Sequence, residues 1–174
     1  MDGAIWGFVG VVVGGLITVG AEIVRARNEA SLDSDKRRDD RAVERERLQR
    51  DTLVELLSAL TELARVTVRI SDARVSASAA AGRWVSIEDQ YMTGEVREAN
   101  AVVQLRVGAL SSIVLDDEVR ALCSKATLAS IFVAQANTRE AAEAALVEHV
   151  TTVADASKRC GAVIRELLIA STSR

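Results

Sequence analysis

The chain has 174 residues, with 27% charged and 49% hydrophobic residues and a formal net charge of −3 at pH 7. This length allows one small domain beside a short membrane segment and leaves no room for a second core. Charges of both signs are interspersed, whereas nucleic-acid-binding surfaces are strongly basic, so we expect no nucleic-acid partner.

The first stretch of the chain, Gly3–Ala21, contains no charged residue, and Glu22 is the first charge after it. An apolar helix of about 20 residues, rising about 1.5 Å per residue, crosses the hydrocarbon core of a bilayer. We therefore predict a transmembrane anchor over residues 1–24. The alternatives are a cleaved signal peptide, which normally opens with a basic region, and a buried core helix, which normally carries a polar face.

The orientation of this anchor follows from the basic residues beside it. None precedes the apolar stretch, and several follow it: Arg25, Arg27, Lys36, Arg37, Arg38 and Arg41. An excess of basic residues stays in the cytoplasm. We therefore expect a single-pass protein of the inner (cytoplasmic) membrane, with its N-terminus outside and its C-terminal domain in the cytoplasm. Arg25 and Arg27 are expected to contact lipid headgroups.

Small residues recur along one stripe of the predicted anchor, at steps of four and three. The stripe consists of Gly3, Gly7, Gly10, Gly14, Thr18 and Ala21. Helices associate in lipid through close backbone approach, which glycine permits. The stripe thus predicts a helix–helix contact in the membrane, either with other copies or with the span of a partner. Glycine is also common in spans generally, and Gly15 and Gly20 lie off the stripe.

Residues 25–50 are dominated by charges of both signs and are predicted to form a juxtamembrane stalk. Interleaved opposite charges at helical spacing favour a solvated helix, although the low apolar content is also compatible with a disordered linker. The sequence Ser31–Asp35 is the expected place for a break, since Ser and Asp side chains compete for backbone hydrogen bonds.

Residues 51–174 are predicted to fold as a cytoplasmic antiparallel helical bundle, giving an all-α fold. Apolar residues alternate in steps of three and four along a first helix that runs to about Ala80, and Gly82 is a plausible C-cap. The seam consists of Leu53, Leu56, Leu60, Leu63 and Ile70, interrupted by Thr67. It can serve either in a coiled coil between copies or in packing within one bundle.

Three further helices are expected after this one. The second starts near Ser86 unless Thr93–Gly94 delays it, and it presents Val96, Val103 and Val107 on its inner face. The third starts at the acidic residues 116–118, which suit the positive end of a helix dipole. The last runs from about 138 to 170, with Leu146, Val150, Val153, Ser157, Cys160, Ile164 and Leu167 in a seam that is proposed to pack against the first helix.

Residues with catalytic or metal-binding potential are few. His149 is the sole histidine, and we expect it at the surface or partly buried. Cys123 and Cys160 are expected to be free thiols within helices. The Glu-x-x-His, Cys-x-x-Cys and glycine-rich phosphate-binding motifs are absent from the sequence. We therefore predict no catalytic residue, metal site or cofactor, and a protein that is not an enzyme.

The segments GFVGVVVGGLITVGAEIVRAR and KRRDDRAVERERLQRDTLVELL resemble a loose group of uncharacterised actinobacterial proteins. The resemblance implies a single membrane span, an Arg-rich stalk and a helical cytoplasmic domain. We expect a membrane-anchored, self-associating interaction or scaffold protein that forms a homo-oligomer and presents its bundle to a cytoplasmic protein partner. The alternative is a pore-forming or membrane-disrupting effector assembled through the glycine-rich span.

Overall fold

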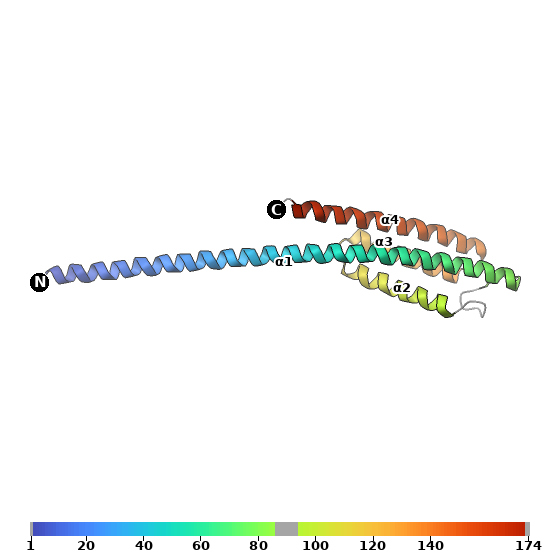
Figure 1. The fold of residues 1–174 in the computed structure, drawn as a ribbon, viewed down its shortest axis with the longest axis horizontal. Helices are drawn as coiled ribbons and strands as arrows, with labels where there is room; N and C mark the ends of the chain where they lie inside the picture. The colour runs from blue at the N-terminus through green and yellow to red at the C-terminus, as the bar shows by residue number, and fades with distance from the viewer. Residues whose placement is uncertain (1, 86–93, 173–174) are drawn as a thin grey trace. The chain divides into compact units, whose positions relative to one another are not determined.

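The computed structural model describes the backbone of residues 2–85 and 94–172 and the side chains of residues 40–85 and 94–170. Four helices occur there (Figure 1): α1 (Asp2–Ala81), α2 (Gly94–Ile113), α3 (Asp117–Gln135) and α4 (Arg139–Thr172). No strand is found in these ranges, so the predicted all-α fold is confirmed for the part of the chain that the structure describes.

The chain divides into two compact units, Met1–Arg45 and Glu46–Arg174. In the first unit, the backbone of α1 is helical from Asp2 onward and has no break at Ser31–Asp35. Within the residues described with side chains, no helix combines the length and the apolar character needed to cross a membrane. The anchor expected over Gly3–Ala21 lies outside those residues and stays a prediction.

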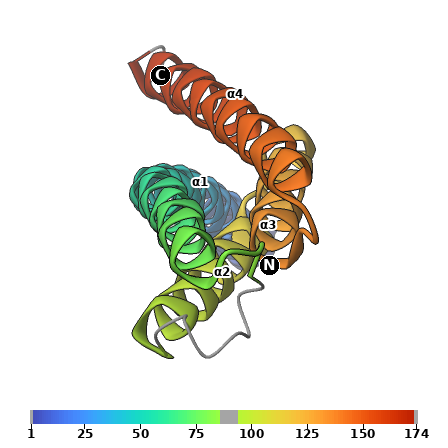
Figure 2. The same ribbon diagram turned by 90° about the vertical axis from the view of Figure 1, so that its right-hand side faces the viewer.

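The second unit is a four-helix bundle in which successive helices run in opposite directions (Figures 1 and 2). The connections at 114–116 and 136–138 are short, which makes α2, α3 and α4 antiparallel neighbours. α3 packs against both α2 and α4. The predicted antiparallel helical bundle is therefore confirmed within the described residues.

The seam of α1 is buried within the bundle of a single chain. Its members Leu53, Leu56, Leu60, Leu63 and Ile70 are all fully buried. They share one core with Val103 and Val107 of α2, Val119 of α3, and Val153 and Cys160 of α4. Since each long aliphatic side chain contributes about 1.5–3 kcal/mol when it is buried, this seam is a major source of the bundle's stability.

Two helix ends follow the expected local signals. Gly82 has a φ of 65°, a left-handed conformation that glycine adopts without strain, and it ends α1. Asp116 caps α3 by accepting a hydrogen bond from the Val119 amide. The described part of α2 starts at Gly94, and the predicted start near Ser86 lies outside the residues that the structure describes.

The inner face of α4 differs from the predicted seam. Val150 leaves 48% of its surface exposed, and its neighbour His149 is fully buried. The buried stripe runs through Ala142, His149, Val153, Ala156 and Cys160, again at steps of seven, four and three. Val153 and Cys160 of the predicted seam are nevertheless buried, and Ile164 and Leu167 pack against the core. The prediction is therefore wrong only where it chose Val150 and Ser157 over their buried neighbours His149 and Ala156.

Candidate functional site

The end of the bundle where α1 stops is built around Arg74, which is fully buried. Its Nε and Nη2 atoms donate hydrogen bonds of 3.0 and 2.9 Å to the Val85 carbonyl. Nη1 and Nη2 also donate to the carbonyls of Val133 and Ala136, at the C-terminal end of α3. Among the described residues no carboxylate pairs with this guanidinium, so backbone carbonyls are its hydrogen-bond acceptors.

Two features stabilise this buried cation. Unpaired carbonyls at a helix C-terminus carry partial negative charge, which favours a cation there. The Trp84 ring lies over the guanidinium, with Cζ 4.6 Å from the ring centroid, and the Trp84 indole donates a 2.9 Å hydrogen bond to the Ala136 carbonyl. Burial lowers the pKa of Arg74, but an arginine remains protonated in proteins. Arg74 thus ties the segment after α1 to α3.

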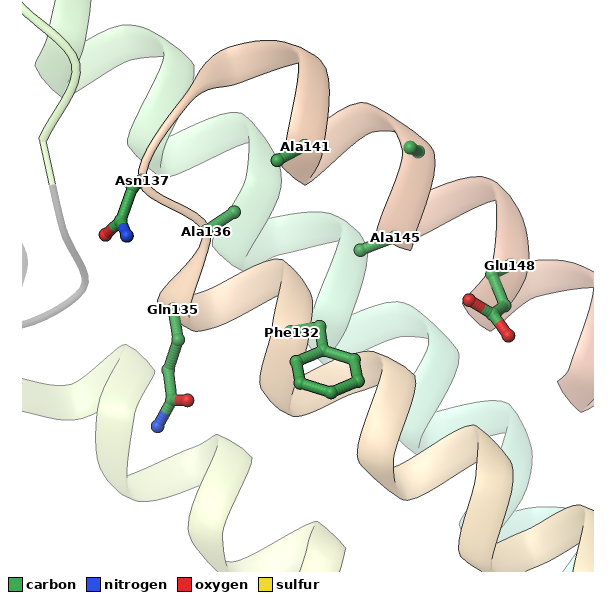
Figure 3. Close-up of a pocket in the computed structure, with 8 residues that line it drawn as sticks. Phe132, Gln135, Ala136, Asn137, Ala141, Ala145 and Glu148 are labelled. Carbon is green, nitrogen blue, oxygen red and sulfur yellow. The ribbon is translucent and has the colours of Figure 1, made fainter.

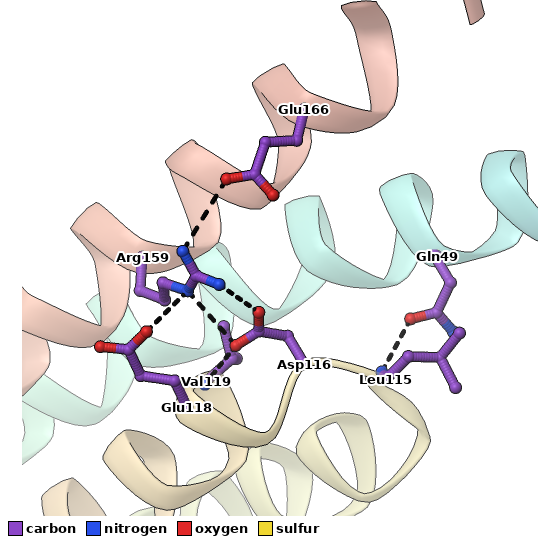
Figure 4. Close-up of polar contacts among 7 residues, drawn as sticks. All are labelled: Gln49, Leu115, Asp116, Glu118, Val119, Arg159 and Glu166. Carbon is purple, nitrogen blue, oxygen red and sulfur yellow. Dashed lines mark hydrogen bonds and ion pairs between the residues drawn. The ribbon is translucent and has the colours of Figure 1, made fainter. Parts of the chain in front are cut away.

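The opposite end of the bundle is closed by Gln49 of α1 (Figure 4). Its Nε2 atom donates a 2.9 Å hydrogen bond to the Ile113 carbonyl, and its Oε1 atom accepts a 3.0 Å hydrogen bond from the Leu115 amide. One side-chain amide therefore satisfies a donor and an acceptor in the connection between α2 and α3.

The N-terminus of α3 lies at this same end and carries an ion-pair cluster (Figure 4). Asp116 Oδ1 accepts the 2.8 Å capping bond from Val119, and Asp116 Oδ2 lies 2.6 Å from Nη2 of Arg159 on α4. Arg159 also lies 3.0 Å from Glu118 and 3.8 Å from Glu166. The hydrogen bond from Arg159 lowers the pKa of Asp116, which keeps this carboxylate ionised.

A polar cluster interrupts the core between the two ends. Thr67 lies 2.8 Å from Ser130, hydroxyl to hydroxyl, and also donates to the Leu63 carbonyl at 2.8 Å. Because Thr67 donates to Leu63, the single Ser130 proton serves both Thr67 and, at 3.4 Å, Asn100 Oδ1, while Ser130 accepts a hydrogen bond from Gln104 at 3.4 Å. The cluster connects α1, α2 and α3, and each hydroxyl in it has a partner, as buried polar groups require.

His149 and the two cysteines are the remaining buried groups with chemical potential. Nδ1 of His149 lies 2.9 Å from the Ala126 carbonyl, so the neutral ring carries its proton on Nδ1. Nε2 has no hydrogen-bond partner among the described residues, and burial lowers the pKa of His149. Burial raises the pKa of the free thiols to about 12 at Cys123 and about 11 at Cys160. Protonated, enclosed thiols are poor nucleophiles.

A surface hollow of about 530 Å³ lies between α3 and α4 (Figure 3). Phe132 and Gln135 line it from α3, and Ala141, Ala145 and Glu148 line it from α4. The wall combines alanine methyl groups and one aromatic ring with two side-chain amides and one carboxylate. This arrangement offers contact area, but it brings no nucleophile and base together.

The residues singled out from sequence fall into three groups. Those of the predicted anchor lie outside the side chains that the structure describes: Gly3, Gly7, Gly10, Gly14, Thr18, Ala21, Arg25 and Arg27. The α1 seam from Leu53 to Ile70 lies in the core. His149, expected at the surface or partly buried, is fully buried, which corrects that expectation.

Sequence reasoning missed the roles of Gln49 and Arg74. Both continue the alternating steps of the α1 seam, four residues before Leu53 and four residues after Ile70. A polar or charged residue at a core position was the available signal.

Searches against protein-family models, curated proteins and solved structures find no match for this chain. The resemblance to actinobacterial single-span proteins therefore stays a prediction. Within the described residues, no group of three or more His, Cys, Asp and Glu side chains is placed to hold a metal ion.

Proposed function

We propose that this chain is a membrane-anchored, self-associating interaction protein without catalytic activity, located in the inner (cytoplasmic) membrane. The observation that carries the proposal is the uncharged stretch Gly3–Ala21, followed by basic residues and preceded by none. Such a stretch is long enough to span a bilayer, and the charge bias directs its C-terminal side to the cytoplasm. The bundle is then the part presented to other proteins.

The character of the bundle supports an interaction role. Arg74 is bound by carbonyls, and Asp116 and Arg159 bind each other, so these charges stabilise the fold. Cys123 and Cys160 are enclosed with raised pKa values, which disfavours thiol chemistry. Exposed apolar side chains are instead present on several helices, including Leu105, Phe132 and Val147. Where exposed apolar side chains form a contiguous patch, the patch marks a contact surface.

The test of the anchor is extraction of the full-length chain from membranes. We expect it to sediment with membranes and to resist alkaline carbonate, which removes peripheral proteins. Val12→Arg places a charge at the centre of the predicted span, where arginine costs about 2.5–3.5 kcal/mol, and should increase the extractable fraction. Val54→Arg, a matched change in the bundle, should leave it unchanged. Full extraction of the wild-type chain would contradict the proposal.

The glycine stripe favours one alternative, a pore-forming or membrane-disrupting effector. A ring of spans needs close helix contacts, which Gly10 and Gly14 would provide. In this alternative the full-length chain releases a trapped dye from liposomes, and replacing both glycines with Leu abolishes the release. If the wild-type chain inserts without any release, the interaction protein is the remaining candidate.

A further inference from the structure

One surface of the bundle is nearly free of charge, although 27% of the whole chain is charged. From 99 to 115 the only charged residue is Arg106, and from 121 to 138 it is Lys125. Arg106 forms a 2.9 Å ion pair with Glu55 of α1, and Lys125 forms a 3.4 Å ion pair with Glu148 of α4. Both cations are therefore directed to other helices, and the surface between α2 and α3 carries no unpaired charge among its described residues.

This surface has both hollows and projections. Two adjoining hollows of about 330 and 750 Å³ lie along α2 and α3 and share Gly108 and Thr127 in their walls. A Cβ added to Gly108 would meet no atom within 4 Å, so space is open above it. Beside the hollows stand Leu105 and Leu128, which are 74% and 50% exposed. We name this surface the α2–α3 face and define it by Ala101, Leu105, Gly108, Ala109, Thr127, Leu128 and Ile131.

We propose that the α2–α3 face binds the same face of a second copy of this chain in a two-fold symmetric dimer. A two-fold interface pairs a patch with itself, so the patch needs both projections and hollows, and Leu105 beside the Gly108 hollow provides both. Helices pack by placing the ridges of one in the grooves of the other, which this relief allows. The proposal rests on the self-association that the proposed function contains, and it assigns a surface to it.

Charge favours a second copy over a charged partner. A nucleic acid, an acidic peptide or a basic peptide would find no complementary charge on this face. Two copies of the chain each carry a net charge of −3, and an uncharged contact lets them meet without placing like charges opposite each other. If both copies are anchored in one membrane, their effective concentration rises, so a modest interface is sufficient.

The first measurement is sedimentation of the full-length chain in detergent micelles across a range of concentrations. We expect Leu105→Glu to raise the dissociation constant of the dimer by about 100-fold, because it buries an unpaired carboxylate in an apolar contact. Val54→Glu places the same charge on an exposed position of α1, and should change it by less than about threefold. An unchanged dissociation constant for Leu105→Glu would overturn the proposal.

A second measurement does not depend on whether Leu105→Glu folds. Gly108→Cys should be cross-linked to its counterpart in a second copy by a short bis-maleimide, whereas Val54→Cys should not. The native cysteines are enclosed and have raised pKa values, so they should not react. Equal cross-linking at positions 108 and 54, or none at 108, would overturn the proposal.

The outcomes also separate this inference from the proposed function. Suppose that the double variant Gly10→Leu, Gly14→Leu lowers the mass of the assembly measured by sedimentation and that Leu105→Glu does not. The span alone then joins the copies, and only the role of the α2–α3 face is rejected. If the wild-type chain is monomeric throughout, self-association fails at both places. Failure of membrane anchoring is detected separately, by carbonate extraction.

Discussion

The two ends of the bundle are closed by side chains of the same helix, but the chemistry differs. At one end Gln49, a neutral amide, exchanges one donor and one acceptor with the backbone around Ile113 and Leu115. At the other end Arg74, a buried cation, donates to carbonyls of Val85, Val133 and Ala136. This difference in chemistry depends on which terminus of α3 lies at each end of the bundle.

At the Gln49 end, the N-terminus of α3 has unpaired amides and takes the carboxylate of Asp116. At the Arg74 end, the C-terminus of α3 has unpaired carbonyls and takes a guanidinium. One helix dipole therefore selects opposite charges at its two ends. The free-energy costs also differ, because losing an ion pair that is only partly buried costs little, whereas removing a buried donor group leaves several acceptors unsatisfied.

The largest expected effect is at Arg74. Arg74→Ala removes the donors to Val85, Val133 and Ala136 and leaves a cavity, so the free energy of unfolding should fall by about 3–5 kcal/mol. Arg74→Lys keeps the charge but replaces the planar guanidinium with a compact ammonium group. We expect it to lower the free energy of unfolding by about half as much as Arg74→Ala. Urea unfolding, followed by circular dichroism and tryptophan fluorescence, measures the free energy of unfolding of both variants.

The matched control for this prediction is Arg69→Ala, an exposed arginine on the same helix. It should change the free energy of unfolding by less than about 0.5 kcal/mol. Equal losses for Arg69→Ala and Arg74→Ala would show that arginine content, and not the carbonyl cluster at the end of α3, determines the effect.

The next largest effect tests the middle of the bundle, away from both ends. Burial lowers the pKa of His149 in the folded chain, so the neutral form is favoured there. As pH falls below about 6.5, the unfolded chain binds a proton that the folded chain does not, and stability decreases. The loss is at most about 1.4 kcal/mol per pH unit and ends near the folded pKa.

This slope belongs to His149 alone, since the chain has one histidine. His149→Leu should therefore flatten the dependence of stability on pH between about 5 and 6.5, measured as urea midpoints at several pH values. Neither end of the bundle titrates in this window, because Arg74 stays protonated and Asp116 stays ionised. A slope that survives His149→Leu would assign the titration to another group.

Much of the bundle could be predicted from periodicity. The alternating steps from Leu53 to Ile70 identified a helix whose buried members the structure places in the core. The acidic residues 116–118 and Gly82 identified helix ends. These signals are local, since they depend on residues a few positions apart.

The parts that were missed depend on distant partners. Arg74 can be buried because it donates hydrogen bonds to carbonyls of α3 and because the Trp84 ring lies over its guanidinium. The residues next to Arg74 in the sequence do not indicate these contacts. His149 and Val150 are adjacent, and hydrophobicity alone favoured burying the valine. The hydrogen bond from His149 to Ala126 crosses from α4 to α3 and offsets part of the cost of burying the ring.

A smaller effect is expected at the α3 N-terminus. Asp116→Ala removes both the cap on Val119 and the ion pair with Arg159, and should cost about 2 kcal/mol. Asp116→Asn keeps a good capping group and loses only the charge, so about 1 kcal/mol is expected. The pair of variants thus separates capping from ion pairing.

The pH and salt responses sharpen this separation. The pKa of Asp116 is lowered in the folded chain, so its contribution is present above about pH 3.9 and is lost as pH falls through the folded pKa. High salt should weaken the contribution of Asp116 and leave that of the buried Arg74 nearly unchanged. A salt-sensitive loss for Asp116→Asn is measured as a change in the urea midpoint between low and high salt.

The smallest effect is expected at Gln49. Gln49→Ala removes two hydrogen bonds that lie at the surface, where water can replace the lost partners, so about 1 kcal/mol is expected. Gln49→Glu keeps the acceptor for the Leu115 amide but loses the donor to the Ile113 carbonyl, and should cost about as much. Arg47→Ala, which breaks an exposed 3.8 Å ion pair with Asp51, is the control and should cost less than about 0.5 kcal/mol. We expect Gln49→Ala to lower the free energy of unfolding less than Arg74→Ala does. An equal loss would show that the amide of Gln49 and the buried cation Arg74 are equally important to the bundle, which would contradict the difference proposed between its two ends.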